Sequence, residues 1–197
     1  SNVTKMFYRF DYTNNTKFKN AIADGHTLEV LFKPDYSGTL LNREAKIFAS
    51  HEQGGTGIMV KRTENGPNNK NTLTFLPNVS KTTASTWRWC ASEVIPVPDE
   101  YYHIVGVWNK DEKKAYIYVN GELQNELTLD GSNYKAAIAG ATSFCIGGDA
   151  TKVSSTKTTG VQNGINGTIV LARIYDDPLD AEQATRLYQD VENGILS

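Results

Sequence analysis

Residues 116–123 read YIYVNGEL, and this stretch decides how the chain folds. Its central Asn-Gly pair tolerates the positive φ angles of a type I′ turn, and the residues before the pair are β-branched or aromatic. The stretch therefore predicts a two-residue hairpin that pairs Val119 with Glu122 and Tyr118 with Leu123. Both faces of its first strand are partly apolar. That pattern is typical of a strand inside a two-layer sandwich, and also of one whose outer face carries an aromatic platform.

Eight further short runs have the composition of strands and are separated by Asn-Gly, Gly-Gly, Asp-Gly and Pro turn signals. These eight runs are residues 6–10, 28–32, 46–49, 57–61, 72–76, 102–108, 144–146 and 168–175, and the hairpin adds strands at 114–119 and 123–129. The last run is apolar on both faces, which predicts a central strand. One segment alone predicts a helix, since Asp180 is a good N-cap, Gln183 can complete a capping box and Gly194 can close the end. Many strands with one late helix indicate an all-β sandwich.

The composition fits one domain spanning residues 1–197 and argues against several classes of function. All-β sandwiches commonly reach about 200 residues without splitting, and 39% apolar residues suffice for a core. The formal net charge is −2 and the basic residues are scattered, so we expect no nucleic-acid partner. No apolar run is long enough to span a bilayer, so we expect no membrane insertion. Residues 1–5 lack the apolar core of a signal peptide, which leaves open a cytoplasmic protein and a mature or excised piece of a secreted one.

Several motifs occur in the order and spacing of a known family. Residues 101–108 (YYHIVGVW) are followed by residues 115–123 (AYIYVNGEL), which gives an aromatic–x–His strand and then a YVNG hairpin. Residues 27–34 (TLEVLFKP), 146–148 (IGG) and 167–180 add further matches. Over nearly its whole length the chain resembles a laminin-G-like (LamG) domain of the concanavalin A-like lectin/glucanase superfamily.

The resemblance implies a fold and a setting, and the sequence departs from the family pattern at one place. The fold is a two-sheet antiparallel jelly-roll sandwich, here with one short C-terminal helix. The setting is an accessory module in secreted or surface proteins, often bacterial and often beside a hydrolase. Members of the family usually end on a Gly-x-Ile-Asp-Glu strand whose acidic pair supports a calcium site, but Val170 and Leu171 stand at those positions and offer no side-chain oxygen. We therefore expect no family-type calcium site, no other metal and no cofactor.

The sequence shows none of the catalytic motifs that this fold class would suggest. Glucanases of the fold carry carboxylates on one strand as Glu-x-Asp, because alternate residues of a strand face the same cleft, and the chain has no Glu-x-Asp. It also has no Gly-x-Ser-x-Gly elbow, Walker loop or His-Glu-x-x-His helix. His103 lies inside a predicted strand and is read as a structural histidine rather than a base. Cys90 and Cys145 fit either two buried thiols or a disulfide. We expect no catalytic residue and no enzyme activity.

The most suggestive candidate for ligand binding is the stretch Trp87-Arg88-Trp89. In an extended segment both indoles project to one side, about 7 Å apart, and two rings so placed can stack on successive sugars. The alternative is that both indoles fill the space between the sheets. Because the flanking residues are polar, we expect at least one indole to be accessible to solvent. Tyr101 and Asp149 complete the candidate ligand-binding set.

Two functions of different classes fit these residues. The first is a noncatalytic carbohydrate-binding accessory module of a larger secreted or surface protein, with a polysaccharide or glycan as its partner. The alternative is a structural or protein–protein interaction domain that packs on a neighbouring catalytic domain, with the same aromatic residues as interface anchors. The setting that the family resemblance implies places the protein outside the cell or on its surface.

Overall fold

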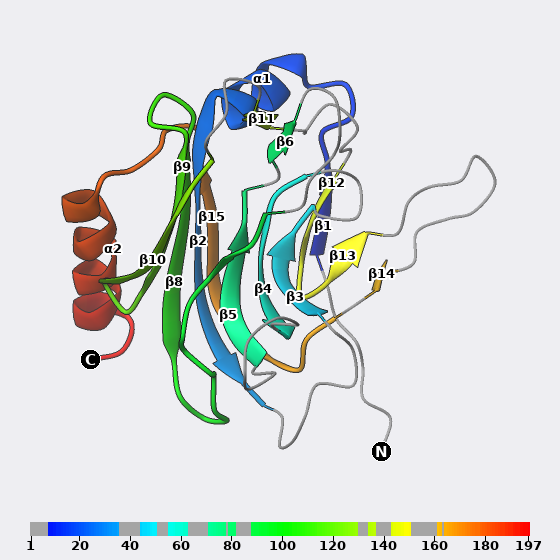
Figure 1. Cartoon of the computed structure of the whole chain (residues 1–197). Helices are drawn as coiled ribbons and strands as arrows, with labels where there is room; N and C mark the ends of the chain where they lie inside the picture. Colours follow the sequence, from blue (N-terminus) through cyan, green and yellow to red (C-terminus); the bar gives the residue numbers. More distant parts are fainter. Residues whose placement is uncertain are drawn as a thin grey trace.

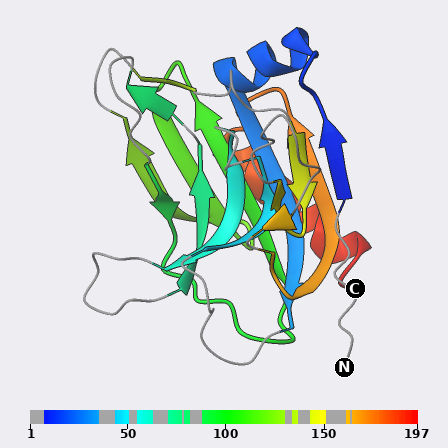
Figure 2. The same cartoon turned by 90° about the vertical axis from the view of Figure 1, so that its right-hand side faces the viewer.

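Alternate apolar residues of the strands meet between two antiparallel sheets, which form a jelly-roll sandwich as the sequence predicts (Figure 1). The structure is a computed structural model that describes residues 8–35, 44–50, 55–62, 71–77, 79–81, 88–129, 134–136, 143–150, 161–162 and 164–197. In Figure 2 the six-stranded sheet lies in front of the five-stranded sheet, and helix α2 (Ala181–Gly194) lies behind both.

The strand order in each sheet shows that the chain crosses repeatedly between the two layers. The six-stranded sheet has the order β1 (Tyr8–Asp11), β12 (Ser143–Ile146), β3 (Glu44–Ala49), β4 (Gly57–Arg62), β5 (Asn71–Leu76) and β7 (Cys90–Ala91). The five-stranded sheet has the order β10 (Glu122–Thr128), β9 (Lys114–Val119), β8 (Tyr102–Asn109), β2 (Gly25–Pro34) and β15 (Gly167–Tyr175). Two short pairs join β6 (Val79–Lys81) to β11 (Tyr134–Ala136) and β13 (Asp149–Ala150) to β14 (Val161–Gln162).

The predicted YVNG hairpin forms between β9 and β10. Val119 pairs with Glu122 and Tyr118 pairs with Leu123, while the Asn-Gly pair between them adopts φ angles of 50° and 78°, as a type I′ turn requires. Alternation along β9 then separates the side chains. Ile117 and Val119 enter the core between the sheets, and Tyr118 packs on the outer face of the five-stranded sheet against α2.

The two sheets approach closely where Gly106 of β8 faces Phe75 of β5. A Cβ atom on Gly106 would lie 2.4 Å from Cδ2 of the Phe75 ring, and this ring is fully buried in the core. Overpacking of this kind forces side chains and backbone to shift. Glycine is therefore required here by the packing of the sandwich.

We predict that Gly106→Ala lowers the free energy of unfolding by about 1–3 kcal/mol, because the fully buried Phe75 ring must shift within the core to make room for the added methyl group. Urea denaturation measures the change. Gly194→Ala is the matched control, since a Cβ atom on Gly194 meets nothing within 4 Å and alanine favours a helix. Equal stability of the two variants would contradict the packing argument.

The C-terminal helix is confirmed, and a second helix was not predicted. The Asp180 side chain accepts a hydrogen bond from the Gln183 backbone N–H, and the Gln183 side chain accepts one from the Asp180 N–H, so the capping box forms. Helix α1 (Thr16–Asp24) closes one end of the sandwich (Figure 1). The prediction of a single helix was wrong because α1 has only nine residues and a mostly polar sequence; its Asn15 N-cap and buried Ile22 give a weak periodic signal.

Strand β15 corrects another prediction. It lies at the edge of the five-stranded sheet in the described part of the chain, not at its centre. Its inner side chains Ile169, Ala172 and Ile174 pack against the core, whereas Val170 is exposed beside a bulge in the pairing with β2. The apolar residues on both faces therefore reflect one core face and one irregularity, and not burial on two sides.

Candidate functional site

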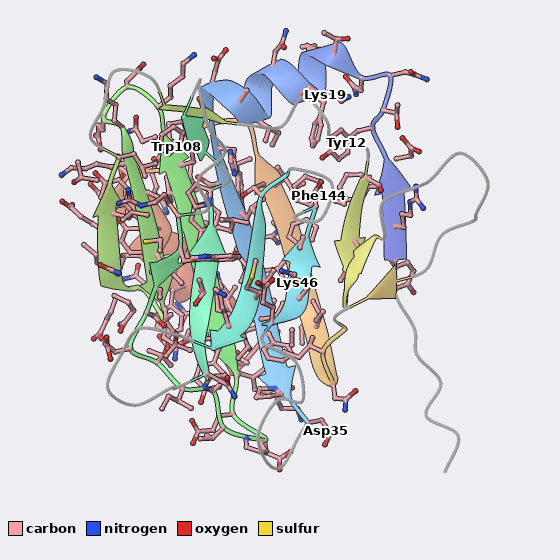
Figure 3. The ribbon with its side chains drawn as sticks, turned by 45° about the vertical axis from the view of Figure 1, so that its right-hand side comes forward. Tyr12, Lys19, Asp35, Lys46, Trp108 and Phe144 are labelled. Atoms are coloured by element: carbon pink, nitrogen blue, oxygen red, sulfur yellow. The ribbon has the colours of Figure 1, made fainter. Side chains whose placement is uncertain are left out.

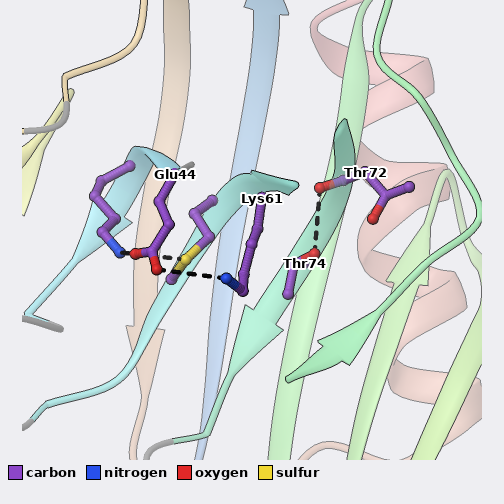
Figure 4. A network of polar contacts seen from close by, with 6 residues as sticks. Glu44, Lys61, Thr72 and Thr74 are labelled. Atoms are coloured by element: carbon purple, nitrogen blue, oxygen red, sulfur yellow. Dashed lines mark hydrogen bonds and ion pairs between the residues drawn. The ribbon is translucent and has the colours of Figure 1, made fainter. Parts of the chain in front are cut away.

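Polar side chains gather on the outer face of the six-stranded sheet, the face turned away from the core. The register places Glu44 of β3 opposite Lys61 of β4 and, on the other side of β4, Lys61 opposite Thr72 of β5. Alternate residues of a strand share a face, so the next row continues the same surface. The outer-face patch, as we call it, consists of Glu44, Lys46, Met59, Lys61, Thr72, Thr74 and Trp89. Figure 4 labels Glu44, Lys61, Thr72 and Thr74 of this patch.

Lys46 anchors the patch midway along the sheet (Figure 3). Its side chain is fully buried, and its ammonium donates to the carboxylate of Glu44 and lies 3.4 Å from Sδ of Met59. A buried ammonium is tolerated only beside a partner that compensates its charge. Glu44 supplies that compensation and is thereby held in place.

Lys61 shares the same carboxylate at a longer distance. Its Nζ lies 3.5 Å from Oε1 of Glu44 and 4.2 Å from the centroid of the Trp89 ring. An ammonium in this position is attracted by the electron-rich face of the indole. The Lys46 ammonium is farther from the Trp89 ring, at 6.0 Å. Trp89 thus lies over both cations with part of its own surface exposed.

Thr72 leaves an unused hydrogen-bonding group in the patch. Its carbonyl oxygen accepts a hydrogen bond from the Thr74 hydroxyl over 3.2 Å, but its own hydroxyl is buried and has no partner among the described residues. Thr72 is only 2% exposed. A buried hydroxyl without a partner is unfavourable, and it is suited to a ligand that supplies one.

The structure places only one of the predicted ligand-binding residues in this patch. Trp89 belongs to it. Tyr101 lies elsewhere, immediately before β8 of the five-stranded sheet. It is 39% exposed, and the Lys33 Nζ lies 5.3 Å from its ring centroid. Trp87 and the side chain of Asp149 lie outside the described residues. The patch therefore does not bring Tyr101 and Trp89 together.

Sequence reasoning missed the lysines and threonines of the patch. Lys46, Lys61, Thr72 and Thr74 all fall inside strands that were predicted, but each is unremarkable alone. The available signal was charge or hydroxyl groups at alternate positions of two strands, Glu44 and Lys46 on one and Thr72 and Thr74 on another, with Lys61 on the strand between them. It becomes meaningful only when the register places those positions side by side.

A second polar cluster lies on the opposite side of the sandwich, on the outer face of the five-stranded sheet. Glu29 is buried there and accepts hydrogen bonds from His103 Nε2 (2.9 Å), Tyr175 Oη (2.6 Å) and Arg173 Nη1 (3.3 Å). Burial alone would raise the pKa of the Glu29 carboxyl, but the bonds from His103 and Tyr175 outweigh it and hold the pKa below its usual value. Burial and the neighbouring Glu29 raise the pKa of Tyr175 to about 12.

The side chains of this second cluster contact one another and helix α2, so the cluster stabilises the fold. The ring of His103 packs against Tyr188 of α2, with 5.9 Å between the ring centroids, and its Nδ1 is buried without a partner among the described residues. Glu29 and His103 therefore face each other and the helix rather than solvent. The cluster thus connects β2, β8 and β15 by hydrogen bonds and contacts α2 through the His103 and Tyr188 rings.

The described residues provide neither a metal site nor a membrane-spanning helix. No three His, Cys, Asp or Glu side chains among the described residues are grouped closely enough to hold a metal ion. Across the same residues, the helices are too short or too polar to cross a membrane. Cys90 and Cys145 are both buried and are not joined to each other by a disulfide, and burial raises the pKa of Cys90 to about 12.

Comparisons with known proteins add to this picture. A family model described as the concanavalin A-like lectin/glucanases superfamily (Laminin_G_3) matches residues 10–185. A comparison with curated proteins finds no match. Similar solved structures include the Ruminococcus gnavus IT-sialidase CBM40 bound to alpha2,3 sialyllactose, with 14% identity, a TM-score of 0.60 and 91% of each chain covered.

Two further structures have the same fold. One is Domain 4 of AbnA, a GH43 extracellular arabinanase from Geobacillus stearothermophilus in complex with arabinotriose, with 15% identity, a TM-score of 0.53, and 85% of this chain and 68% of that chain covered. The other is the native heptameric SAP-like pentraxin from Limulus polyphemus, with 16% identity, a TM-score of 0.56, and 84% and 70% covered. At such low identities the likeness establishes the fold alone.

Proposed function

This chain belongs to the concanavalin A-like lectin/glucanases superfamily, and from that premise we propose that it is a noncatalytic carbohydrate-binding module of a larger secreted or surface protein. One observation carries the proposal: Trp89 lies partly exposed over Lys61, and Lys61 is the ladder partner of Thr72, whose buried hydroxyl has no partner among the described residues. Sugars are held by an aromatic ring that stacks on their C–H faces and by a few placed polar groups. The related folds that carry sialyllactose and arabinotriose support the same class of ligand.

The noncatalytic part of the proposal follows from the carboxylates. Hydrolysis of a glycosidic bond requires two carboxyl groups across the scissile bond. Glu44 is the only carboxylate in the outer-face patch, and both lysines of the patch contact it. It is held as a counter-ion and is not free to act as an acid or a nucleophile.

A second candidate function rests on a different surface. Ile95, Val97 and Tyr101 are exposed within one short segment that leads into β8. Exposed apolar and aromatic side chains that lie together mark contact sites for other proteins. In this alternative the segment packs on a neighbouring catalytic domain, and the outer-face patch has no ligand.

We predict that Trp89→Ala lowers affinity for the saccharide selected on a glycan array by about tenfold or more, because the stacking surface is lost. Isothermal titration calorimetry measures the change, and thermal melting confirms that the variant is folded. Trp89→Phe should retain part of the affinity. Tyr101→Ala is the control, because it removes an exposed aromatic ring outside the patch and should leave saccharide affinity unchanged.

The same two variants separate the candidate functions. Loss of saccharide binding in Trp89→Ala alone supports the carbohydrate-binding module. Absence of saccharide binding, together with a complex with the neighbouring domain that Tyr101→Ala weakens, would replace it with the interaction domain.

A further inference from the structure

We propose that the outer-face patch selects saccharides that carry a carboxylate, and that Lys61 and Thr72 receive this group. The inference rests on the proposed carbohydrate-binding function and names the class of its ligand. Three features of the patch carry it: the hydrogen-bonding capacity of Lys61, the position of the Thr72 hydroxyl, and the distribution of cations over the sheet face.

Lys61 has N–H donors that no described residue uses. An ammonium group has three N–H donors. Among the described residues, its only oxygen partner is Glu44 at 3.5 Å, a distance too long for a good charge-assisted hydrogen bond. Lys46 makes the closer contact with the same carboxylate. Lys61 is only 9% exposed, so water compensates its charge poorly and an anionic ligand group would be favoured beside it.

The hydroxyl of Thr72 lies on the same face as Lys61 and in the neighbouring strand. The two residues are direct partners in the β4–β5 ladder, and side chains so paired have Cβ atoms about 5 Å apart. The buried Thr72 hydroxyl has no partner in the described part of the chain and can donate one hydrogen bond. One carboxylate can therefore accept from the ammonium through one oxygen and from the hydroxyl through the other. A neutral sugar hydroxyl would satisfy Thr72 but would leave the charge of Lys61 poorly compensated.

Trp89 turns this anion site into a site for a ring-shaped ligand. Its indole lies over Lys61 and retains exposed surface, and the Glu44 side chain beside it is 19% exposed. A ligand therefore has access from solvent next to the indole. A sugar ring stacked there would bring a carboxylate attached to it toward Lys61, whereas a small inorganic anion would leave the aromatic surface unused.

The positive character of this sheet face extends toward β1. Following the register from β4 through β3 and β12 places Arg9 on the same face as Lys61. Its Nη1 is buried without a partner among the described residues, and the Asp11 carboxylate is 3.9 Å from its other terminal nitrogen. A second cation on the same face suits an oligosaccharide with more than one acidic sugar.

The test compares ligands that differ only in the carboxylate. A hexuronic-acid oligosaccharide, its methyl ester and its carboxyl-reduced neutral form are titrated by calorimetry, and sialyllactose is compared with its own methyl ester in the same way. We expect the acidic member of at least one pair to bind about tenfold more tightly than its neutral counterpart, with the preference falling as salt rises. A preference confined to one pair identifies the source of the carboxylate.

Variants assign the preference to residues. Lys61→Met and Thr72→Val each preserve side-chain volume and should reduce the acid preference, which is the ratio of the affinities for the acidic and the neutral form, to about threefold or less. Lys61→Arg keeps the charge and should retain the preference. Lys114→Met is the matched control, because Lys114 pairs with Glu126 on the other sheet and the acid preference should not change. Thermal melting of each variant confirms that it is folded.

The possible failures are distinguishable. Equal binding of acid and neutral forms, both lost in Trp89→Ala, overturns the acid preference and leaves the carbohydrate-binding function standing. Binding of no saccharide at all overturns the proposed function itself. An acid preference that survives Lys61→Met and Thr72→Val overturns the assignment to these residues. Full competition by acetate at equal concentration would show that the site does not recognise the sugar and overturns the proposal.

Discussion

Removing the Glu29 carboxylate by Glu29→Ala should lower the free energy of unfolding by about 3–5 kcal/mol at pH 7. Glu29 is fully buried and accepts hydrogen bonds from His103, Tyr175 and Arg173. The substitution leaves the buried His103 ring and the half-buried Tyr175 hydroxyl without this partner, which costs much more than the loss of a surface ion pair. Urea denaturation monitored by tryptophan fluorescence gives the change.

Two comparisons make the Glu29 result specific. Glu126→Ala removes an exposed carboxylate whose Lys114 partner lies at 2.7 Å, and it should cost less than about 1 kcal/mol. Tyr175→Phe removes a single hydrogen bond and should cost about 1 kcal/mol. Where it remains folded, Glu29→Ala should bind saccharide normally, because Glu29 and Trp89 lie on opposite faces of the sandwich. A cost for Glu29→Ala no larger than that for Glu126→Ala would show that the buried cluster contributes little.

The fold was largely predictable because its determinants are local. The Asn-Gly turn fixes the pairing of Val119 with Glu122, and the two-residue alternation marks each long strand to within a few residues. The family resemblance adds the jelly-roll arrangement, and the match over residues 10–185 confirms it. Local sequence patterns did not predict the position of a strand within its sheet, because that position depends on the other strands with which it pairs. The edge position of β15 depends on which strands pair, and that choice is not written in residues 168–175 themselves.

The candidate site was less predictable than the fold. Trp89 stands out in the sequence because tryptophan is rare and its neighbours are polar. Lys61 and Thr72 do not, since each is an ordinary strand residue, and they are eleven positions apart on opposite sides of a long connection. Only the β4–β5 register makes them partners. The expectation that Tyr101 would join Trp89 rested on composition, which carries no information about which sheet a side chain faces.

Acidification should destabilise the protein by about 3 kcal/mol between pH 6.5 and pH 4 through His26 alone. His26 is fully buried at one end of the core, and burial lowers its pKa from 6.5 to about 4. Above pH 6.5 the ring is neutral in both the folded and the unfolded chain, so the contribution is constant. Between pH 6.5 and pH 4 the unfolded chain binds a proton that the folded chain does not, and unfolding becomes more favourable. Below about pH 4 both states are protonated and the contribution levels off.

The hydrogen bonds of His26 make the sign of this effect informative. Nδ1 lies 2.8 Å from the Ile22 carbonyl oxygen and must donate to it, which leaves Nε2 as the acceptor of a neutral ring. Nε2 faces the Thr56 hydroxyl at 3.0 Å, but that hydroxyl also lies 2.6 Å from the Leu76 carbonyl oxygen. One hydroxyl proton therefore serves two acceptors. A protonated ring would relieve this conflict, yet it would place a cation in the core with no carboxylate in contact among the described residues.

Denaturation midpoints measured from pH 7.5 to pH 4.5 decide between the two ring states, since that range lies above the titration of most carboxylates. We expect the free energy of unfolding of the native protein to decrease as the pH is lowered. It should decrease less steeply in His26→Gln, whose side chain does not titrate. Thr56→Val removes the hydroxyl and should lower stability at every pH without removing the slope. Stability that instead rises as the pH falls through 6.5 would mean that the folded protein holds the ring protonated, with Nε2 donating to Thr56, and that these acceptors outweigh the cost of burying the charge.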